Sequence, residues 1–262
     1  MEPPAQLRVA TYNIHKCRGF DGKTSPSRII EVLRELEADI LCLQEVVNAP
    51  HARRPIFDQA HDISRAFPEY EWSFGANRPL RGGTYGNMTL ARRPMRGSRN
   101  HNLSRQGREQ RGVLQTDILL DNGEILHVFN VHLGTGHMER RFQARLLMSE
   151  AVLGQSNFSG SRLVVGDFNE WTRGLTTRLL RNSFQTFRPE HGLRYPRTYP
   201  GMLPLLSLDH CYYEPPLELE AARLWRSPRA LIASDHLPLI TDFRLTDRKS
   251  EPVSERSGHT RL

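Results

Sequence analysis

Residues Leu163 to Glu170 read LVVGDFNE, and the rest of the chain is best understood as arranged around them. Their apolar start is the pattern of a strand buried on both faces, and Gly166 then allows a sharp turn. Asp167 and Asn169 follow two residues apart, so a carboxylate and a carboxamide can face one cleft while Phe168 anchors the turn. Asp and Asn are also common in ordinary turns, so the stretch predicts a site only in combination with others like it.

The length of 262 residues suits one large domain, which we expect over residues 1–246, followed by a polar, disordered tail at 247–262. No apolar window is long enough to span a membrane. The N-terminus lacks the basic segment and apolar core of a secretory signal. Cys17, Cys42 and Cys211 are odd in number and widely spaced, which favours buried free thiols in a reducing compartment and a cytoplasmic location.

The formal net charge of +7 makes polyanions plausible partners of the chain. Arginine, whose planar head group suits phosphate contact, recurs in several polar loops: Arg78, Arg81, Arg92, Arg93, Arg105, Arg108 and Arg111. Most of these side chains are equally expected on an ordinary solvated surface.

Apolar runs that alternate with helical patterns and hairpins predict an α/β fold of two packed sheets with helices outside. Strands are expected at 7–14, 39–46, 70–74, 85–91, 112–120, 124–131, 163–165, 207–213, 219–225 and 238–245. Helices are expected from Ser25 onward and at 56–67, 138–153 and 172–180, with Phe142 among the inward positions. Asp121-Asn122-Gly123 is a strong hairpin signal, whereas 92–111 and 181–206 show no clear period and are expected to be irregular loops.

Polar residues terminate many of these apolar runs: Asn13, Glu45, Asn87, His132, Asp167, Asn169, Asp209, Asp235 and His236. Each alone has an ordinary structural explanation. Together they are acids, amides and imidazoles at strand ends, which is how α/β sheets build sites. Hard oxygen ligands without paired thiols favour Mg²⁺ or Mn²⁺ over structural zinc. Two histidines with separate carboxylate partners suit acid–base catalysis on a phosphoester.

The chain also resembles the endonuclease/exonuclease/phosphatase family, which includes pancreatic-type deoxyribonuclease, AP endonuclease, sphingomyelinase and inositol-polyphosphate 5-phosphatase. The resemblance extends from about Leu7 to Leu245 and rests on seven ordered stretches: TYNIHKCRG, DILCLQEV, YGNMTLARRP, FNVHLG, VVGDFNEW, SLDHCYY and ASDHLPL. Each motif is weak alone, but seven in the right order are highly specific. The resemblance implies a four-layered α/β sandwich of two mixed, mostly antiparallel sheets and a metal-dependent phosphodiesterase.

The resemblance further implies a metal site for Mg²⁺ or Mn²⁺. Glu45 matches the family's principal metal-binding carboxylate. Asn13 matches the amide beside it that helps to organise metal and phosphate, and Asp235 matches an acid close to the metal. His15 stands where AP endonucleases have an aspartate, so a two-acid version of this site is not expected.

Catalytic roles follow from the same resemblance. Asp167 would orient or activate the attacking water, and Asn169 would hold a phosphate oxygen. His236 matches the histidine of the terminal SDH motif, and Asp209 matches the carboxylate that fixes its tautomer. Either Asp167 or the His236–Asp209 pair would take the proton from water.

His132 and Asn87 are the remaining candidates for contact with the substrate phosphate. His132 matches a histidine that lies beside the scissile phosphate in deoxyribonuclease-like and sphingomyelinase-like members. No acid near 74–78 is available to pair with it as in deoxyribonuclease. Asn87 falls in a strand that the family motifs include.

Three functions remain open at this stage. The favoured one is a nuclease or other phosphodiesterase that acts on nucleic acid, for which basic loops would track the backbone. The same chemistry on a phospholipid head group or a phosphoinositide would use the basic loops equally well. A non-catalytic binding module is the third, although a binder has no need of the complete set of acids, amides and histidines.

Overall fold

The computed structural model describes residues 6–51, 58–80, 82–155, 158–171, 174–188, 190 and 196–246, which form two six-stranded sheets. The first sheet consists of β1 (Gln6–Asn13), β2 (Ile40–Asn48), β3 (Glu71–Leu80), β4 (Gly83–Ala91), β11 (Leu217–Leu224) and β12 (Leu239–Leu245). The second consists of β5 (Met95–Asn102), β6 (Gly112–Leu119), β7 (Ile125–His132), β8 (Ser161–Asp167), β9 (Gln185–Thr186) and β10 (Asp209–Tyr213). The strand orders are β11-β12-β1-β2-β4-β3 and β5-β6-β7-β8-β10-β9.

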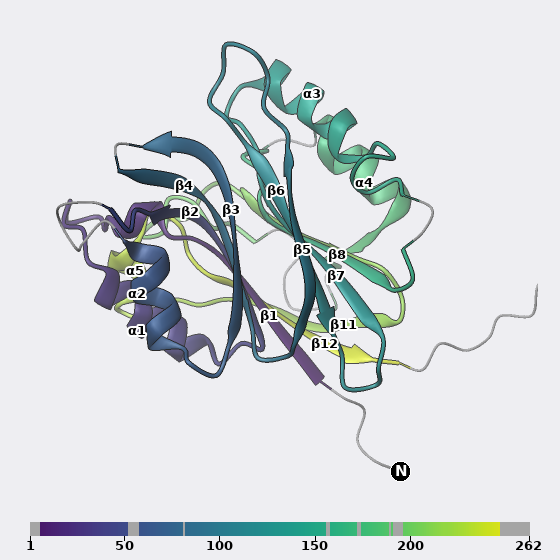
Figure 1. Cartoon of the computed structure of the whole chain (residues 1–262), viewed down its shortest axis with the longest axis horizontal. Coiled ribbons are helices and arrows are strands. Elements are labelled where there is room, and N and C mark those ends of the chain that lie inside the picture. Colours follow the sequence, from purple (N-terminus) through teal and green to yellow (C-terminus); the bar gives the residue numbers. More distant parts are fainter. Residues whose placement is uncertain are drawn as a thin grey trace, which may run out of the picture.

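Helices cover the outer faces of both sheets. They are η1 (His15–Cys17), α1 (Pro26–Leu36), α2 (Gln59–Ala66), α3 (His137–Leu147), α4 (Leu175–Ser183) and α5 (Ala230–Ala233). Figure 1 shows α1, α2 and α5 outside the first sheet and α3 and α4 outside the second. This arrangement confirms the predicted four-layered sandwich. None of the helices within the described ranges is long and apolar enough to cross a membrane.

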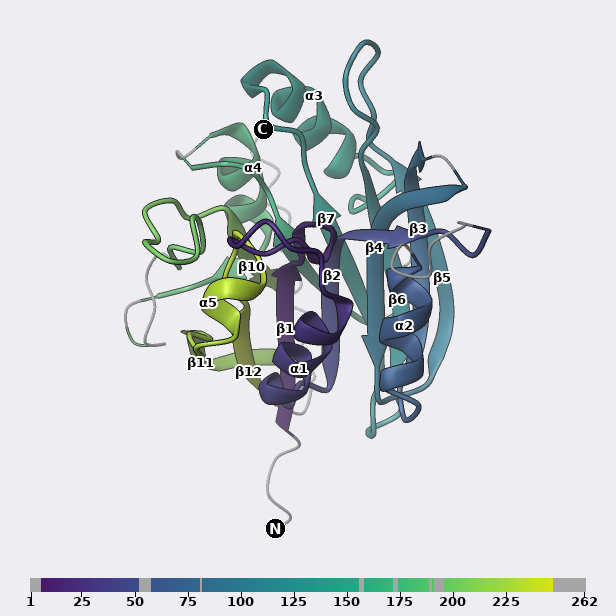
Figure 2. The same cartoon turned by 90° about the vertical axis from the view of Figure 1, so that its left-hand side faces the viewer.

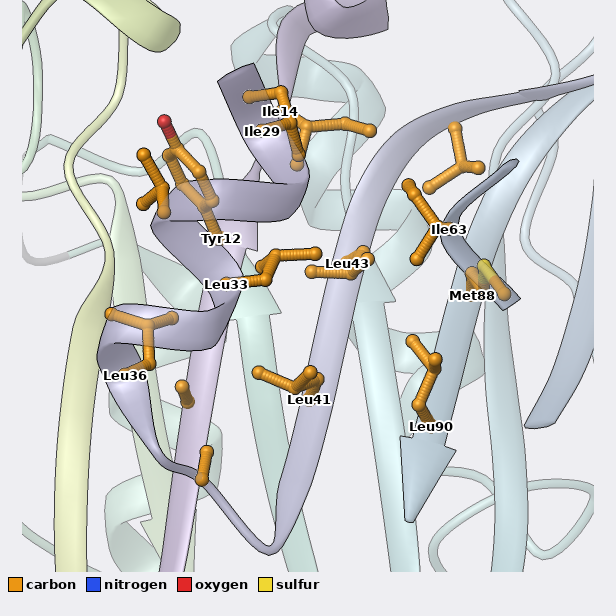
Figure 3. Close-up of a cluster of buried hydrophobic side chains, with 14 of the residues drawn as sticks. Tyr12, Ile14, Ile29, Leu33, Leu36, Leu41, Leu43, Ile63, Met88 and Leu90 are labelled. Carbon is orange, nitrogen blue, oxygen red and sulfur yellow. The ribbon is translucent and has the colours of Figure 1, made fainter. Parts of the chain in front are cut away.

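Helix α1 forms where its sequence signals place it. Ser25 caps the helix by accepting a hydrogen bond from the backbone N–H of Arg28 at 3.3 Å, and Pro26 occupies the first turn. The buried side chains of α1 recur at helical spacing: Ile29, Val32, Leu33 and Leu36. Figure 3 shows this layer, with Leu33 lying against Leu43 of β2. The outer layer is therefore fixed by an amphipathic helix on a buried strand.

Two parallel strand pairs, one in each sheet, end at the same place. In the β1–β2 pair Asn13 lies opposite Gln44, and in the β7–β8 pair His132 lies opposite Asp167. Figure 2 shows β1 and β2 side by side behind α1. The Nδ2 of Asn13 donates a hydrogen bond to Oδ2 of Asp167 at 2.9 Å, which joins the two pairs across the sheets. Carboxyl ends of strands from both sheets therefore meet, as α/β sites require.

A buried amide lies between the sheets and bonds to both. The Oδ1 of Asn130 accepts from Nε2 of Gln44 at 2.8 Å, and its Nδ2 donates to the carbonyls of Leu43 at 3.1 Å and Met88 at 3.0 Å. Asn130 is fully buried. Because these bonds tie β7 to β2 and β4 at one register, they align the two halves of the site.

Replacing Asn130 with Ala is expected to lower the free energy of unfolding by about 3 kcal/mol, because it leaves buried groups such as Gln44 Nε2 without a partner. The check is the urea midpoint at an unchanged slope. Asn100→Ala is the matched control, since the Asn100 amide binds the Ala76 carbonyl from an exposed position. Equal effects of the two substitutions would contradict the role assigned to Asn130.

Three expectations about residues 92–153 are wrong. The segment 92–111 is not an irregular loop, because it contains β5, which pairs antiparallel with β6 at a sheet edge. Most β5 side chains are exposed, so no apolar period marks the strand in the sequence. Helix α3 ends at Leu147 rather than at 153, since Ser149 Oγ binds the Leu146 carbonyl in the turn that follows. Phe142, expected to face inward, is exposed.

Other boundaries differ by smaller amounts. Strand β3 extends through Leu80, beyond the expected 70–74, and α4 ends at Ser183 rather than at 180. The first residues expected in the helices at 56–67 and 172–180 lie outside the described ranges, as do Arg81 and the expected tail at 247–262. The hairpin predicted at Asp121-Asn122-Gly123 is confirmed, because β6 and β7 pair from Leu119 opposite Ile125 onward.

Candidate active site

A cavity of about 270 Å³ opens where β1, β2, β7 and β8 end. Seven residues predicted from the sequence line it: Asn13, Glu45, His132, Asp167, Asn169, Asp235 and His236. These residues come from positions spread over more than two hundred residues of the chain. The structure thus brings nearly the whole predicted set into one place.

Asp167 is the meeting point of the polar groups in the cavity. Besides the Asn13 amide, the Nε2 atoms of His132 and His236 lie 3.6 and 3.8 Å from its Oδ2. Its Oδ1 accepts a hydrogen bond from the backbone N–H of Asn169 at 2.8 Å. Burial raises the pKa of Asp167, and Asp209 adds to the rise while His236 opposes it, giving a value of about 7.

The backbone around Asp167 explains why the GDFN stretch is needed here. At Gly166 φ is +144°, and a Cβ would lie 2.1 Å from the Val131 carbonyl, so only glycine fits. Asn169 has a left-handed φ of 49°, a conformation that asparagine tolerates better than most residues. Its Nδ2 donates to the Leu133 carbonyl at 3.0 Å, which fixes the side chain at the cavity wall.

Asp209 lies behind the cavity and supports His236. The Nδ1 of His236 is 2.8 Å from Oδ2 of Asp209, so this nitrogen carries the proton and Nε2 faces Asp167. Burial alone would lower the pKa of His236. Asp209 and Asp167 outweigh it and raise that pKa to about 10. His236 is therefore held as an imidazolium between two carboxylates.

Glu45 contacts a lysine that the sequence analysis did not single out. The Nζ of Lys16 lies 2.6 Å from Oε2 of Glu45 and 5.2 Å from the centroid of the Tyr85 ring. Burial would raise the pKa of Glu45, but nearby positive charge, including that of the hydrogen-bonded Lys16 ammonium, lowers it to about 2. Glu45 is thus anionic at any ordinary pH.

The turn that carries Lys16 is strained. His15, Lys16 and Cys17 have consecutive positive φ values of 45°, 55° and 57°, which costs roughly 1–2 kcal/mol per residue. Asn13 Oδ1 accepts from the His15 backbone N–H at 3.0 Å, and Gln59 Nε2 donates to the Lys16 carbonyl at 2.6 Å. These bonds hold the turn so that His15 Nδ1 lies 3.4 Å from Oδ1 of Asp235.

The donor set suits a hydrated Mg²⁺ or Mn²⁺. Within the described ranges, no cluster of three or more histidines, cysteines and acids forms a closed metal cage. Two carboxylates, Glu45 and Asp235, and the Asn13 amide line the same cavity. Mg²⁺ is usually held by one or two carboxylates together with waters and substrate phosphate oxygens rather than by a protein cage. The residues present therefore fit the ion implied by the sequence.

His132 lies closer to an arginine than to Asp167. The NH1 of Arg111 lies 3.1 Å from Nδ1 and 3.2 Å from Nε2 of the ring. Burial, and then the Arg111 charge, hold the pKa of His132 well below its ordinary value, so the ring is neutral. Arg111 is buried and lines the cavity, and its Nε has no hydrogen-bond partner among the described residues. In the sequence Arg111 cannot be told apart from the other loop arginines, because burial leaves no mark on a single charged residue.

Asn87 is not brought to the cavity. Its fully buried side chain donates to the carbonyls of Gly112 at 3.3 Å and Asn130 at 2.9 Å, between the sheets. The expected contact with a substrate phosphate is therefore replaced by a bond between β4 and the second sheet.

The remaining wall of the cavity is apolar. It consists of Trp171, Tyr199, Leu206 and Leu208, with Thr135 beside them. Arg140 stacks on Trp171 with 4.9 Å between its guanidinium carbon and the ring centroid, and donates to the Thr135 carbonyl. Tyr199 and Leu206 lie in the segment expected to be an irregular loop.

Comparison with known proteins agrees with this geometry. The model of the endonuclease/exonuclease/phosphatase family matches residues 10–236. Uncharacterized protein YbhP of Escherichia coli K12 is 32% identical over 254 residues, which cover 91% of this chain and 96% of that protein. An endonuclease/exonuclease/phosphatase structure from Beutenbergia cavernae shares 21% identity over 92% of this chain and 72% of that one, with a TM-score of 0.76. The Bacteroides thetaiotaomicron mannosyl-6-phosphatase Bt3783 shares 18% over 90% and 99%, with a TM-score of 0.71. With the fold, the ordered motifs and the lined cavity in agreement, the chain belongs to the endonuclease/exonuclease/phosphatase family.

Proposed function

We propose that this chain is a divalent-metal-dependent phosphodiesterase that cleaves a phosphoester bond by in-line attack of water. The observation that carries the proposal is the convergence on Asp167 of His132, His236 and Asn13, in a cavity that Glu45 and Asp235 also line. A binding module has no need of such a set, because it does not move protons.

The residues divide into groups that hold the phosphate and groups that move or neutralise charge. When bound, Mg²⁺ or Mn²⁺ at Glu45, Asn13 and Asp235 would neutralise negative charge on the phosphoryl oxygens. On the protein side, Arg111 and the neutral His132 face the cavity as donors for phosphate oxygens. The Asn169 amide is placed to help them.

Proton transfer is assigned to Asp167. Its carboxylate lies at the centre of the cavity, where a water aligned with the phosphorus can donate to it. His236 is held between Asp209 and Asp167, so it carries a positive charge and stabilises the charge that develops as the ester bond breaks. Asp209 keeps the proton on Nδ1 of His236 and does not touch substrate.

Arg111→Met is expected to raise the KM for a soluble phosphodiester about tenfold, because a charged donor to phosphate is lost. The His132 pKa should rise at the same time, since the adjacent positive charge disappears. Steady-state kinetics and NMR titration of the ring measure the two effects. Arg78→Met is the control, because Arg78 is exposed and paired with Glu109. An unchanged KM in Arg111→Met would remove Arg111 from the site.

Nucleic acid, the substrate class favoured from the sequence, receives less support from the arginines that suggested it. Arg78 pairs with Glu109 at 3.2 Å, Arg93 pairs with Asp121 at 2.5 Å, and Arg111 lies inside the cavity. Nucleic acid therefore stays in the test as the competing substrate. The buried free thiols of the described residues support a reducing compartment, and we propose that the protein acts in the cytoplasm.

The test is a substrate panel with EDTA blanks: plasmid DNA, abasic duplex, single-stranded RNA, sphingomyelin, phosphatidylglycerol and inositol phosphates. The proposal expects hydrolysis of at least one phosphodiester that requires Mg²⁺ or Mn²⁺ and stops with EDTA. Hydrolysis of none of them with either ion would contradict it.

A further inference from the structure

Exposed apolar side chains gather around the mouth of the cavity. The described part of the chain exposes nine large hydrophobic side chains. Six of them lie at residue 20 and in the segments 171, 199–206 and 230–236, and these three segments also supply residues to the cavity wall. These six form what we call the apolar rim: Phe20 (42% exposed), Trp171 (50%), Met202 (60%), Leu203 (69%), Leu205 (60%) and Ile232 (43%). Scattered exposed hydrophobics are normal, but their concentration at one functional opening is not.

Hydrogen bonds connect the loops of the rim to the catalytic residues. The backbone N–H of Phe20 donates to the Ile232 carbonyl at 3.0 Å, and α5, which carries Ile232, leads directly to Asp235. The N–H of Gly201 donates to the Asp235 carbonyl at 2.8 Å. In Figure 2 the green loop that contains residues 199–206 lies beside α5. The rim is therefore attached to the same segment that supplies two cavity residues.

The most exposed part of the rim is a turn that backbone hydrogen bonds hold in place. Tyr199 and Leu206 exchange backbone hydrogen bonds of 3.1 and 2.7 Å at its base, and both side chains line the cavity. Met202, Leu203 and Leu205 lie between them and point into solvent. Because backbone bonds hold the turn, the apolar tips are presented without a packing partner. Exposed apolar side chains on such a turn are better suited to insertion into an apolar phase such as a bilayer than to forming a pocket for a partner.

Positive charge accompanies the rim. Arg18 and Lys23 flank Phe20, and Arg197 precedes the turn at 199–206; all three are exposed. The acid in the Phe20 loop, Asp21, is already paired with Arg28 at 2.9 Å. Apolar tips bordered by exposed cations match a surface that has an apolar interior and anionic head groups.

We propose that the apolar rim docks on an anionic phospholipid bilayer and that the substrate is the head-group phosphodiester of a phospholipid. The location of the rim decides between occupants, since a protein partner or a second copy seated on it would cover the entrance to the cavity. A bilayer on the same surface supplies the substrate instead. This inference rests on the proposed phosphodiesterase function for its substrate, but the docking itself does not require turnover.

The test is flotation of the full chain with vesicles of phosphatidylcholine alone and of phosphatidylcholine mixed with phosphatidylglycerol. The wild type is expected to float with the mixed vesicles, and the combined variant Met202→Asp, Leu203→Asp and Leu205→Asp to bind them about a hundredfold more weakly. The control is Trp72→Asp, because Trp72 is 43% exposed but pairs with Leu90, at the end of β4 away from the cavity. Trp72→Asp should bind like the wild type.

Hydrolysis provides the second readout. Head-group release from mixed vesicles should fall with binding in the combined variant, while hydrolysis of a soluble diester stays within about twofold of the wild type. The inference is overturned if the wild type binds neither vesicle type, or if the combined variant binds vesicles as well as the wild type does. It is also overturned if the combined variant loses binding to plasmid DNA and the wild type does not bind vesicles. Vesicle binding without any hydrolysis overturns the proposed function alone. Hydrolysis of the soluble diester without vesicle binding overturns the docking alone.

Discussion

Replacing Asp167 with Asn is expected to reduce kcat for a soluble phosphodiester about 10³-fold with little change in KM. Asparagine has the same shape and can still accept the hydrogen bond that the Asn169 backbone N–H now gives to Oδ1. It cannot take a proton from water. The measurement is steady-state turnover at saturating Mg²⁺, with Asp117→Asn as the control, because Asp117 pairs with His127 away from the cavity.

Measuring the free energy of unfolding of Asp167→Asn shows whether the variant loses activity because it fails to fold. The pKa of Asp167 is about 7 in the folded chain, against about 4 when unfolded. Between those values the folded state binds more protons, so this group makes the metal-free wild type less stable as pH rises. Asparagine does not titrate, so Asp167→Asn does not lose stability in this way. Its free energy of unfolding relative to that of the wild type should therefore increase from pH 4 to pH 7. An Asp167→Asn variant that is inactive and also less stable than the wild type at pH 7 would contradict the assignment of proton transfer to Asp167.

Replacing Glu45 with Gln is expected to raise the Mg²⁺ concentration needed for half-maximal rate by at least about a hundredfold. Glu45 supplies a carboxylate whose low pKa keeps it charged, and glutamine offers only a neutral amide oxygen. Mn²⁺ binding measured by electron paramagnetic resonance reports the same loss without turnover.

Lys16→Met is the matched variant for this experiment and should change metal binding in the opposite direction. The Lys16 ammonium lies 2.6 Å from Oε2 of Glu45 and competes with a cation for that oxygen. Its removal should tighten Mn²⁺ binding. If Glu45→Gln bound Mn²⁺ as tightly as the wild type, the metal would have to lie elsewhere.

Strands with continuous apolar runs could be predicted from the sequence because burial on both faces leaves a strong composition signal. β1, β2 and β8 are of this kind, and their polar end residues pointed directly to the site. β5 could not be found in this way, since an edge strand with solvated side chains has the composition of a loop.

The candidate site was predictable where residue type and position both carried a signal. Asp167 ends β8 and His236 lies shortly before β12, both within recognisable motifs, and both line the cavity. Arg111 and Lys16 carried no such signal, because a cation in a loop is usually solvated and only the fold shows it buried or facing an acid. For Asn87 the motif was misleading. It suggested a phosphate contact, but the packing of the two sheets places the Asn87 amide between them.

The most direct test of the central claim is the release of p-nitrophenol from bis(p-nitrophenyl) phosphate by the wild-type chain, with Mg²⁺, with EDTA, and with Mg²⁺ restored. We predict release that requires the ion, stops with EDTA and returns when Mg²⁺ is added in excess, while Glu45→Gln stays near background. A wild type that releases no more p-nitrophenol than Glu45→Gln with either Mg²⁺ or Mn²⁺ would contradict the assignment of this cavity as a phosphoesterase site.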